Sequence, residues 1–420
     1  MKLAALKALP NKFTSGHIFM LSSLLVNAGN YLYNLILGRV LGPSAFSDAA
    51  LMITLLLIMS FLAMTFQLAT AKFTVTFDQS VSVHFRKKMF CYALLAGVIF
   101  GSLLIIFSKD LQQIFQTSAY SMFTILGIGV PIYFLLSVNR GVFQGKQRFG
   151  ALSMTYQTEM WSRLLITLGL LWLFKTDTSI LVSIGILCSL LLGIFPLDKQ
   201  TLSINKPSDK LDSHQKKAMI VFLSITAFYE MTQIIINNSD ILLVKHYFSQ
   251  LEAGLYASLA LIGRVVYFVA WMFVMQLLPA VVQKQKNGES HKGELFKYVG
   301  WIALLSVAIV LSCAIMPELI INIMFGDLYI SMAHLLWLYA TATSLFAISN
   351  IFCYYFLSLE KYIPVVISGV MGLVQVFLIV IFHESLDQVV YVQIIAMAVL
   401  LISQCIFFKM YSQNKKQFSL

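Results

Sequence analysis

Two sets of polar side chains, each spaced by three or four residues, interrupt long apolar stretches of this sequence. They are Asn27, Asn30 and Asn34 in the first half, and Glu230, Gln233, Asn237 and Asp240 in the second. On a helix these spacings place each set on one face. Amides and carboxylates inside a bilayer are costly unless they face protein or water. The sets therefore predict a polar cavity, and their recurrence predicts a duplicated transporter.

The asparagines have a second interpretation, in which they only form hydrogen bonds between neighbouring helices, worth about 0.6–2 kcal/mol each in model systems. Three amides on one face are more than such bonding usually needs. The spacing therefore favours a lining that contacts substrate, and Asn237 joins the predicted substrate-binding residues Asn27, Asn30 and Asn34.

Four ionisable side chains fall near the middle of apolar segments, namely Glu159, Arg163, Glu230 and Arg264. Burying an unpaired charge at that depth costs from about 3 to over 10 kcal/mol, so each needs a partner or water. Glu159 and Arg163 lie four residues apart and can pair on one helix. Such a pair is either structural and self-neutralised, or it holds Arg163 ready for an anionic substrate.

Arg264 has no carboxylate within a turn of its own helix, so its partner is another helix or a ligand. Glu230 is the protein candidate, but a cavity role is favoured because a guanidinium donates two parallel hydrogen bonds to a diphosphate. Glu230 is alternatively a site for a coupling H⁺ or Na⁺, since a carboxylate in an apolar cavity binds a proton more readily. Asp240 is a second ion-coupling candidate, although its place near a helix end predicts an ordinary, half-exposed carboxylate.

Further basic residues lie at the predicted cytoplasmic helix ends. Lys72 can extend its amine to lipid headgroups, and Arg140 and Arg148 most simply fix the topology. The alternative is that Lys72 and Arg140 contact an anionic substrate.

The elements that position these residues must be membrane helices. The chain is 59% hydrophobic and 11% charged, with a mean hydropathy of +0.84, which predicts an all-α integral membrane protein. Apolar segments long enough to cross about 30 Å of hydrocarbon predict twelve transmembrane helices in two six-helix lobes related by pseudo-twofold symmetry. The expected division is residues 1–197 for the N-terminal lobe, 198–216 for a cytoplasmic linker and 217–420 for the C-terminal lobe. The expected spans are 14–38, 46–71, 88–108, 119–139, 150–174, 178–197, 217–244, 253–282, 296–316, 329–357, 362–382 and 388–408.

The net charge of +11 is distributed in a way that predicts orientation. Most of the 29 basic residues fall on one side if both termini are cytoplasmic, and the outer loops hold only Arg39, Lys109, Lys175 and Lys245. This is the positive-inside pattern, so nucleic-acid binding is not needed to explain the charge.

Catalytic motifs are not found in the sequence. The seven histidines are scattered, and the five cysteines lie in or beside apolar spans, which indicates packing rather than a disulfide or metal site. The sequence therefore predicts no enzyme and no cofactor. A membrane polymerase or ligase is disfavoured because every predicted outer loop is short.

Short motifs give the sequence a family resemblance. They are Asn-x-x-Leu-Gly-Arg-x-Leu-Gly-Pro ending at Pro43, the segment from Arg140 to Phe149, and Asp-Ile-Leu-Leu and Ala-Gly-Leu-Tyr beginning at Asp240 and Ala253. The chain resembles the Wzx-type polysaccharide flippases, in the MOP superfamily that also holds MATE exporters and lipid II flippases. It departs from the pattern at Phe46-Ser47, where the family more often has glycine after the aromatic residue.

The resemblance implies a flippase of the bacterial cytoplasmic membrane. Its substrate would be an undecaprenyl-diphosphate-linked oligosaccharide for O-antigen, capsule or exopolysaccharide, moved outward by alternating access. It also implies association with a polysaccharide polymerase and a chain-length regulator. The alternative is a MATE-like, H⁺- or Na⁺-coupled exporter of cations that uses Glu230 and Asp240. Arg163 and Arg264 argue against a cationic cargo, because they would repel it.

Overall fold

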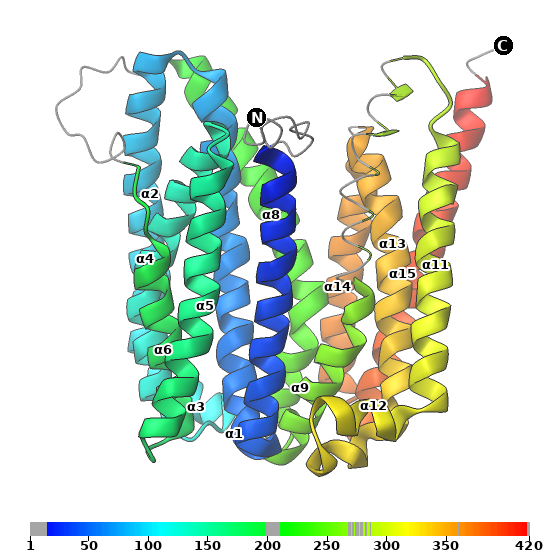
Figure 1. The fold of residues 1–420 in the computed structure, drawn as a ribbon. Helices are drawn as coiled ribbons and strands as arrows, with labels where there is room; N and C mark the ends of the chain where they lie inside the picture. The colour runs from blue at the N-terminus through cyan, green and yellow to red at the C-terminus, as the bar shows by residue number, and fades with distance from the viewer. Residues whose placement is uncertain are drawn as a thin grey trace, which may run out of the picture. The chain divides into compact units, whose positions relative to one another are not determined.

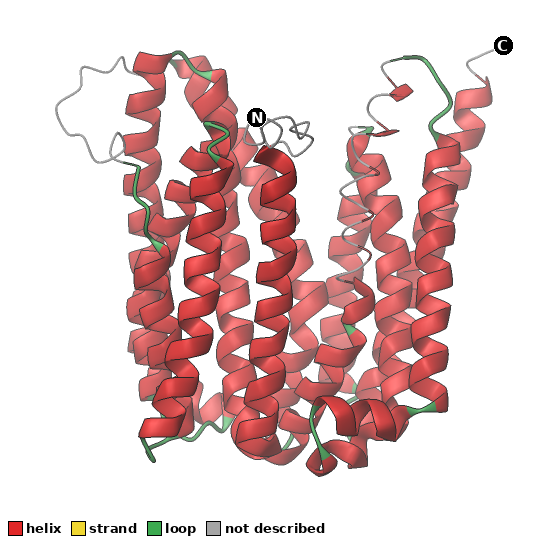
Figure 2. Ribbon diagram, in the orientation of Figure 1, coloured by secondary structure: helices red, strands yellow, loops and turns green. Residues whose placement is uncertain are grey.

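The computed structural model describes residues 15–198 and 211–417, apart from Glu360 and several positions between 268 and 286. Every regular element in this part of the chain is helical (Figures 1 and 2). Eight helices among the described residues are long and apolar enough to cross a membrane. The predicted all-α membrane fold is confirmed, while the number twelve stays a prediction. The eight candidate spans are Phe19–Thr76, Val81–Ile106, Ser121–Gly145, Ser213–Tyr247, Lys292–Ile315, Asp327–Ser358, Ile363–Ile381 and Leu386–Gln413.

The first helix contains two of the predicted spans. α1 runs from Ser15 to Thr76 and kinks at Gly42, whose φ of 71° and ψ of 168° are not helical. Glycine adopts a positive φ without the steric cost of a side chain. Pro43 follows, at a position where its missing N–H is tolerated because a helix restarts there. The predicted spans 14–38 and 46–71 are therefore two arms of one kinked element.

The chain forms two compact units, each described by itself. Unit 1 comprises residues 1–33, 59–109 and 119–226, and unit 2 comprises 34–58, 110–118 and 227–420. Two segments from the first half of the sequence thus belong to unit 2. The short helix α3 (Ser108–Phe115) and the long helix α8 (Ser213–Tyr247) each contribute residues to both units. The lobes expected at 1–197 and 217–420 stay a prediction.

Unit 1 is a helical bundle held by close backbone approach. Its helices are α2 (Gln79–Ile106), α4 (Ser121–Gly145), α5 (Phe149–Leu173) and α6 (Thr178–Gly193), with parts of α1 and α8. α4 packs against both α2 and α6, and α5 packs against α6 (Figure 1). Gly101 of α2 lies directly against Gly127 of α4, since a Cβ on Gly101 would be 2.4 Å from the Gly127 carbonyl oxygen. Small residues at a membrane-helix contact allow this approach.

Unit 2 contains the rest of the described helices. They are α9 (Gln250–Gly263), α11 (Lys292–Ile315), α12 (Pro317–Met324), η2 (Asp327–Leu335), α13 (Leu336–Ser358), α14 (Ile363–Ile381) and α15 (Leu386–Gln417), with most of α8. α13 packs against α9, α11 and α15, and α14 packs against α15. α13 is accordingly the buried centre of the unit.

Gly254 of α9 has no room for a side chain, because a Cβ there would lie 1.8 Å from the Pro43 carbonyl oxygen in the same unit. We expect Gly254→Ala to lower the unfolding free energy by about 2 kcal/mol or more through overpacking. Thermal unfolding of the purified protein in detergent measures this. Gly300→Ala in α11, where nothing lies within 4 Å of the new Cβ, is the matched control. Equal midpoints for the two variants would show that the contact with Pro43 is dispensable.

Candidate substrate-binding site

Unit 1 buries two arginines around one carboxylate. Arg140 of α4 donates from Nη2 to Glu159 Oε2 at 2.6 Å, and Arg163, one turn after Glu159 on α5, pairs with Oε1. All three side chains are buried, with Arg140 only 2% exposed. Each oxygen of the Glu159 carboxylate therefore accepts from a different guanidinium.

Further contacts fix Arg140 in this position. Its Nε and Nη2 each donate at 3.1 Å to Thr155, the first to the hydroxyl and the second to the backbone carbonyl. Its guanidinium carbon lies 3.8 Å from the centre of the Tyr156 ring, a cation–π distance. The sequence interpretation of Arg140 as a topology-fixing residue at a helix end is therefore wrong. Its side chain lies inside the bundle because α5 presents a carboxylate, a hydroxyl and an aromatic face to it.

The charge of this cluster also corrects a prediction. Glu159 and Arg163 do pair, as their spacing predicts, but the pair is not self-neutralised because Arg140 shares the same carboxylate. Two guanidinium groups against one carboxylate leave a formal charge of +1. α6 closes the other side, since Gly193 brings its backbone against Glu159 and Ser189 lies 3.5 Å from Arg163 Nε. An anion is the ligand that would complete this charge balance.

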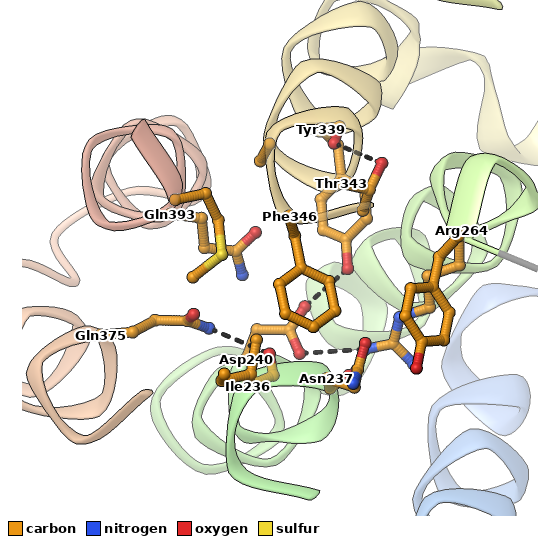
Figure 3. Close-up of a pocket in the computed structure, with 12 residues that line it drawn as sticks. Ile236, Asn237, Asp240, Arg264, Tyr339, Thr343, Phe346, Gln375 and Gln393 are labelled. Atoms are coloured by element: carbon orange, nitrogen blue, oxygen red, sulfur yellow. Dashed lines mark hydrogen bonds and ion pairs between the residues drawn. The ribbon is translucent and has the colours of Figure 1, made fainter. Parts of the chain in front are cut away.

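Unit 2 buries a different ion pair, drawn in Figure 3. Asp240 of α8 accepts from Arg264 Nη2 at 3.1 Å and from the Tyr339 hydroxyl at 2.7 Å (Figure 3). It also accepts from the Tyr256 hydroxyl at 3.2 Å. Gln393 in turn donates to the Tyr256 hydroxyl at 2.7 Å. The Asp240 carboxylate thus accepts from three buried donors.

This geometry overturns two expectations. The partner of Arg264 is Asp240 and not Glu230. Asp240 is 2% exposed instead of half-exposed, because α8 continues to Tyr247 and keeps Asp240 more than a turn from the helix end. Since Arg264 neutralises it, Asp240 is a weak candidate for a coupling cation.

Arg264 lies where a helix is interrupted. α9 ends at Gly263, whose carbonyl accepts a hydrogen bond from the Thr343 hydroxyl at 2.8 Å, and Arg264 also donates to the Asn237 carbonyl. A cavity of about 30 Å³ adjoins this break and is lined by Asp240, Arg264 and Thr343 among others (Figure 3). That volume holds water but no sugar or diphosphate.

Glu230 differs from the other buried carboxylates. It is 8% exposed, and within the described residues its carboxylate has no hydrogen bond or ion pair. Tyr267 and Tyr354 are close enough to interact with it electrostatically. A buried carboxylate without a cation is a site at which a proton or a small cation would be favoured.

Of the remaining predicted residues, Asn237 belongs to the Arg264 cluster, since its carbonyl accepts from Arg264 and it lines the same cavity. Asn27 is exposed, Asn30 and Asn34 are partly buried, and Asn237 donates to the Gln233 carbonyl on its own helix. Lys72 is exposed, with its amine 4.1 Å from the centre of the Phe222 ring.

Sequence reasoning missed a buried ion pair in unit 2. Lys245 Nζ lies 2.7 Å from Asp48 Oδ1 and also donates to the Ser47 hydroxyl at 2.7 Å, while the Ser118 backbone N–H donates to Asp48 Oδ2 at 2.9 Å. Lys245 is therefore buried at the end of α8 and does not belong to an outer loop. The sequence feature that could have predicted this pair is Asp48, an acidic residue a few positions after Pro43 and inside an apolar segment, where a carboxylate needs a partner.

Other chemistry is sparse in the described part of the chain. No group of three His, Cys, Asp or Glu side chains there is placed to hold a metal ion, and Cys91, Cys188, Cys313, Cys353 and Cys405 are all free thiols.

Known structures share this fold. An inward-facing multidrug resistance MATE transporter of the MOP superfamily is 12% identical, with a TM-score of 0.78 over 94% of this chain and 96% of that one. The lipid II flippase MurJ in an inward closed conformation is also 12% identical, with a TM-score of 0.75 over 93% of this chain and 87% of that one. A MATE structure in the bent conformation is 13% identical, with a TM-score of 0.64 over 96% and 95%. These matches show the MATE- and MurJ-like fold of the MOP superfamily.

Sequence comparisons give the family. No curated protein matches this chain. A family profile with the description "Polysaccharide biosynthesis protein" matches residues 36–334, well over half of the sequence. The chain is therefore a multi-pass membrane protein that belongs to the polysaccharide biosynthesis protein family.

Proposed function

We propose that the protein is a flippase for an undecaprenyl-diphosphate-linked oligosaccharide, which it moves from the inner to the outer leaflet of a bacterial cytoplasmic membrane. The family membership supports a role in surface polysaccharide biosynthesis. The fold supports transport, since it is the fold of MATE transporters and of a lipid II flippase.

The observation that carries the proposal is the excess positive charge around Glu159. Arg140 and Arg163 are both buried and share one carboxylate, so the cluster attracts an anion in a medium where electrostatic interactions are strong. A diphosphate matches the parallel donors of a guanidinium. We infer that Arg163 contacts the diphosphate and that Glu159 holds both arginines in place before substrate arrives.

A cation exporter is the second candidate, and Glu230 is the observation that favours it. A buried carboxylate with no ion pair among the described residues would suit a cationic cargo, whereas Arg140 and Arg163, which share one carboxylate, would repel one. Within the flippase proposal Glu230 takes the coupling role for H⁺ or Na⁺, because Asp240 already has a cation in Arg264.

The proposed direction of transport agrees with the membrane potential. In the orientation predicted by the basic residues, both termini lie in the cytoplasm. Outward movement of negative charge across an inside-negative membrane gains about 2.3 kcal/mol per charge per 100 mV. Alternating access of the two lobes would carry the headgroup while the isoprenoid chain stays in lipid. A polymerase and a chain-length regulator would act on the product outside.

Deletion of the gene is the test in cells. We expect loss of surface polysaccharide and accumulation of the lipid-linked repeat unit on the cytoplasmic leaflet. A plasmid with Arg163→Gln should restore less than a tenth of the polysaccharide, because losing a charged hydrogen bond to substrate costs about 1.5–3 kcal/mol. Lys409→Gln, at an exposed basic residue of α15, should restore it fully. Unchanged polysaccharide with altered tolerance of cationic drugs would reject the flippase and favour the exporter.

A further inference from the structure

Three basic side chains converge on one carboxylate at an end of unit 1, away from the Glu159 cluster. Asp198 follows α6 and is buried. Lys146 Nζ lies 2.9 and 3.0 Å from its two carboxylate oxygens, and Arg148 Nη1 and Arg86 Nη1 each lie 3.5 Å from one of them. The cluster joins the start of α2, the end of α4 and the segment after α6.

Asp198 is held in place by the backbone around it. Asn139 of α4 donates from Nδ2 to the Ile194 carbonyl at 3.2 Å and to the Pro196 carbonyl at 2.9 Å. Its Oδ1 accepts from the Asp198 backbone N–H at 3.1 Å. The carboxylate is therefore positioned by the loop that carries it and would stay near the basic groups if one of them were removed.

The cluster carries more positive charge than Asp198 neutralises. Among the described residues, three cations against one carboxylate leave a formal +2. Arg86 is 4% exposed, and its Nη1 has no hydrogen-bond partner among the described residues, although its Nε donates to the Ser82 carbonyl. A buried guanidinium nitrogen with only a long ion-pair contact, here 3.5 Å from Asp198 Oδ2, and no hydrogen bond is costly. An oxyanion with several acceptor oxygens would satisfy it and balance the charge.

The burial of this basic cluster is not explained by membrane orientation alone. Basic residues that only set orientation keep their charges in water, whereas Arg86 is buried and aimed at a fixed carboxylate. The cluster is accessible from one side, because Arg148 is 57% exposed and Lys146 is partly exposed. A ligand can therefore approach over Arg148 and Lys146 and reach toward Arg86.

We propose that Arg86, Lys146 and Arg148 form a binding site for a phosphate oxyanion, and that Asp198 occupies this site as a built-in counter-ion when no ligand is bound. The site is separate from the Arg140–Glu159–Arg163 cluster and does not depend on the flippase proposal. The phosphate belongs either to an anionic phospholipid headgroup or to a diphosphate such as that of a lipid-linked sugar, and both present the same oxygens to the basic groups.

The test is thermal unfolding of the full chain in a neutral detergent. One arm adds inorganic pyrophosphate, compared with sodium chloride at equal ionic strength. The other arm adds phosphatidylglycerol to the micelles, compared with phosphatidylcholine. We expect the anionic probe to raise the unfolding midpoint of the wild type. Asp198→Asn should lower the half-saturating probe concentration about tenfold, and the double variant Lys146→Gln, Arg148→Gln should raise it about 100-fold, at about tenfold per charged contact.

The outcomes separate this site from others. Stabilisation by phosphatidylglycerol alone assigns the site to a headgroup, and stabilisation by pyrophosphate alone assigns it to a diphosphate. Lys409→Gln should keep the response, because it removes an exposed basic charge of α15 that lies outside the cluster. If Asp198→Asn unfolds more readily, the anionic probe should restore its midpoint and chloride should not. The proposal is wrong if neither probe stabilises the wild type, or if the double variant responds as the wild type does.

Discussion

Glu159→Gln should destabilise the protein by about 3–5 kcal/mol, the usual cost of removing one partner from a buried ion pair. The substitution leaves the guanidinium groups of Arg140 and Arg163 side by side without a carboxylate. Each carboxylate oxygen of Glu159 accepts from a different guanidinium, so an amide keeps an oxygen toward one of them and turns an N–H₂ donor toward the other. The loss should appear as a lower thermal unfolding midpoint and a smaller yield of folded protein in the membrane.

The size of this effect depends on which residue of the cluster is removed. Arg163→Gln leaves Arg140 and Glu159 as a neutral pair, so it should cost much less stability than Glu159→Gln while still losing transport. Glu318→Gln, at an exposed carboxylate in the first turn of α12, is the matched control and should be near neutral. If Glu159→Gln unfolds at the same temperature as Glu318→Gln, Glu159 does not hold the two arginines together.

Asp240→Asn should produce a loss of similar size in unit 2. The change removes the negative charge that Arg264 needs and weakens the acceptor of the Tyr339 and Tyr256 hydroxyls. Arg264 lies at the end of α9. Its release should therefore also weaken the hydrogen bond from the Thr343 hydroxyl to the Gly263 carbonyl at that helix end. We expect a cost of about 3–5 kcal/mol, measured as the thermal unfolding midpoint in detergent.

A double-variant cycle gives this prediction its control. Adding Arg264→Gln to Asp240→Asn removes both charges and should recover part of the lost stability, because no unpaired charge remains. Asp110→Asn, at an exposed carboxylate of α3, should have little effect. If the stability lost in the double variant equals the sum of the losses in Asp240→Asn and Arg264→Gln alone, Asp240 and Arg264 do not act as a pair.

Much of the architecture can be predicted from the sequence because it depends on local patterns. Apolar segments of membrane-spanning length mark the helices, and Gly42-Pro43 marks the kink between the first two spans. The pairing of Glu159 with Arg163 is also local, since residues four apart lie on one face of a helix.

The partners that sequence reasoning missed all lie on different helices. Arg140 and Glu159 belong to α4 and α5, Arg264 and Asp240 belong to different helices of unit 2, and Lys245 pairs with Asp48 across nearly 200 positions of sequence. Spacing along one chain carries no information on such contacts. The burial of Asp240 was missed for another reason, because α8 continues beyond the apolar segment that predicted it.

The most direct test of the central claim is lipid flipping by the purified protein in vesicles. Proteoliposomes would carry a fluorescent isoprenyl-diphosphate oligosaccharide in the membrane, with its headgroup accessibility read by an added glycosidase or a membrane-impermeant quencher. The account predicts that wild-type protein moves the headgroup between leaflets, that Arg163→Gln does so at least tenfold more slowly, and that Lys409→Gln matches the wild type. Vesicles in which the oligosaccharide stays in its original leaflet, while the same protein transports a cationic dye, would contradict it.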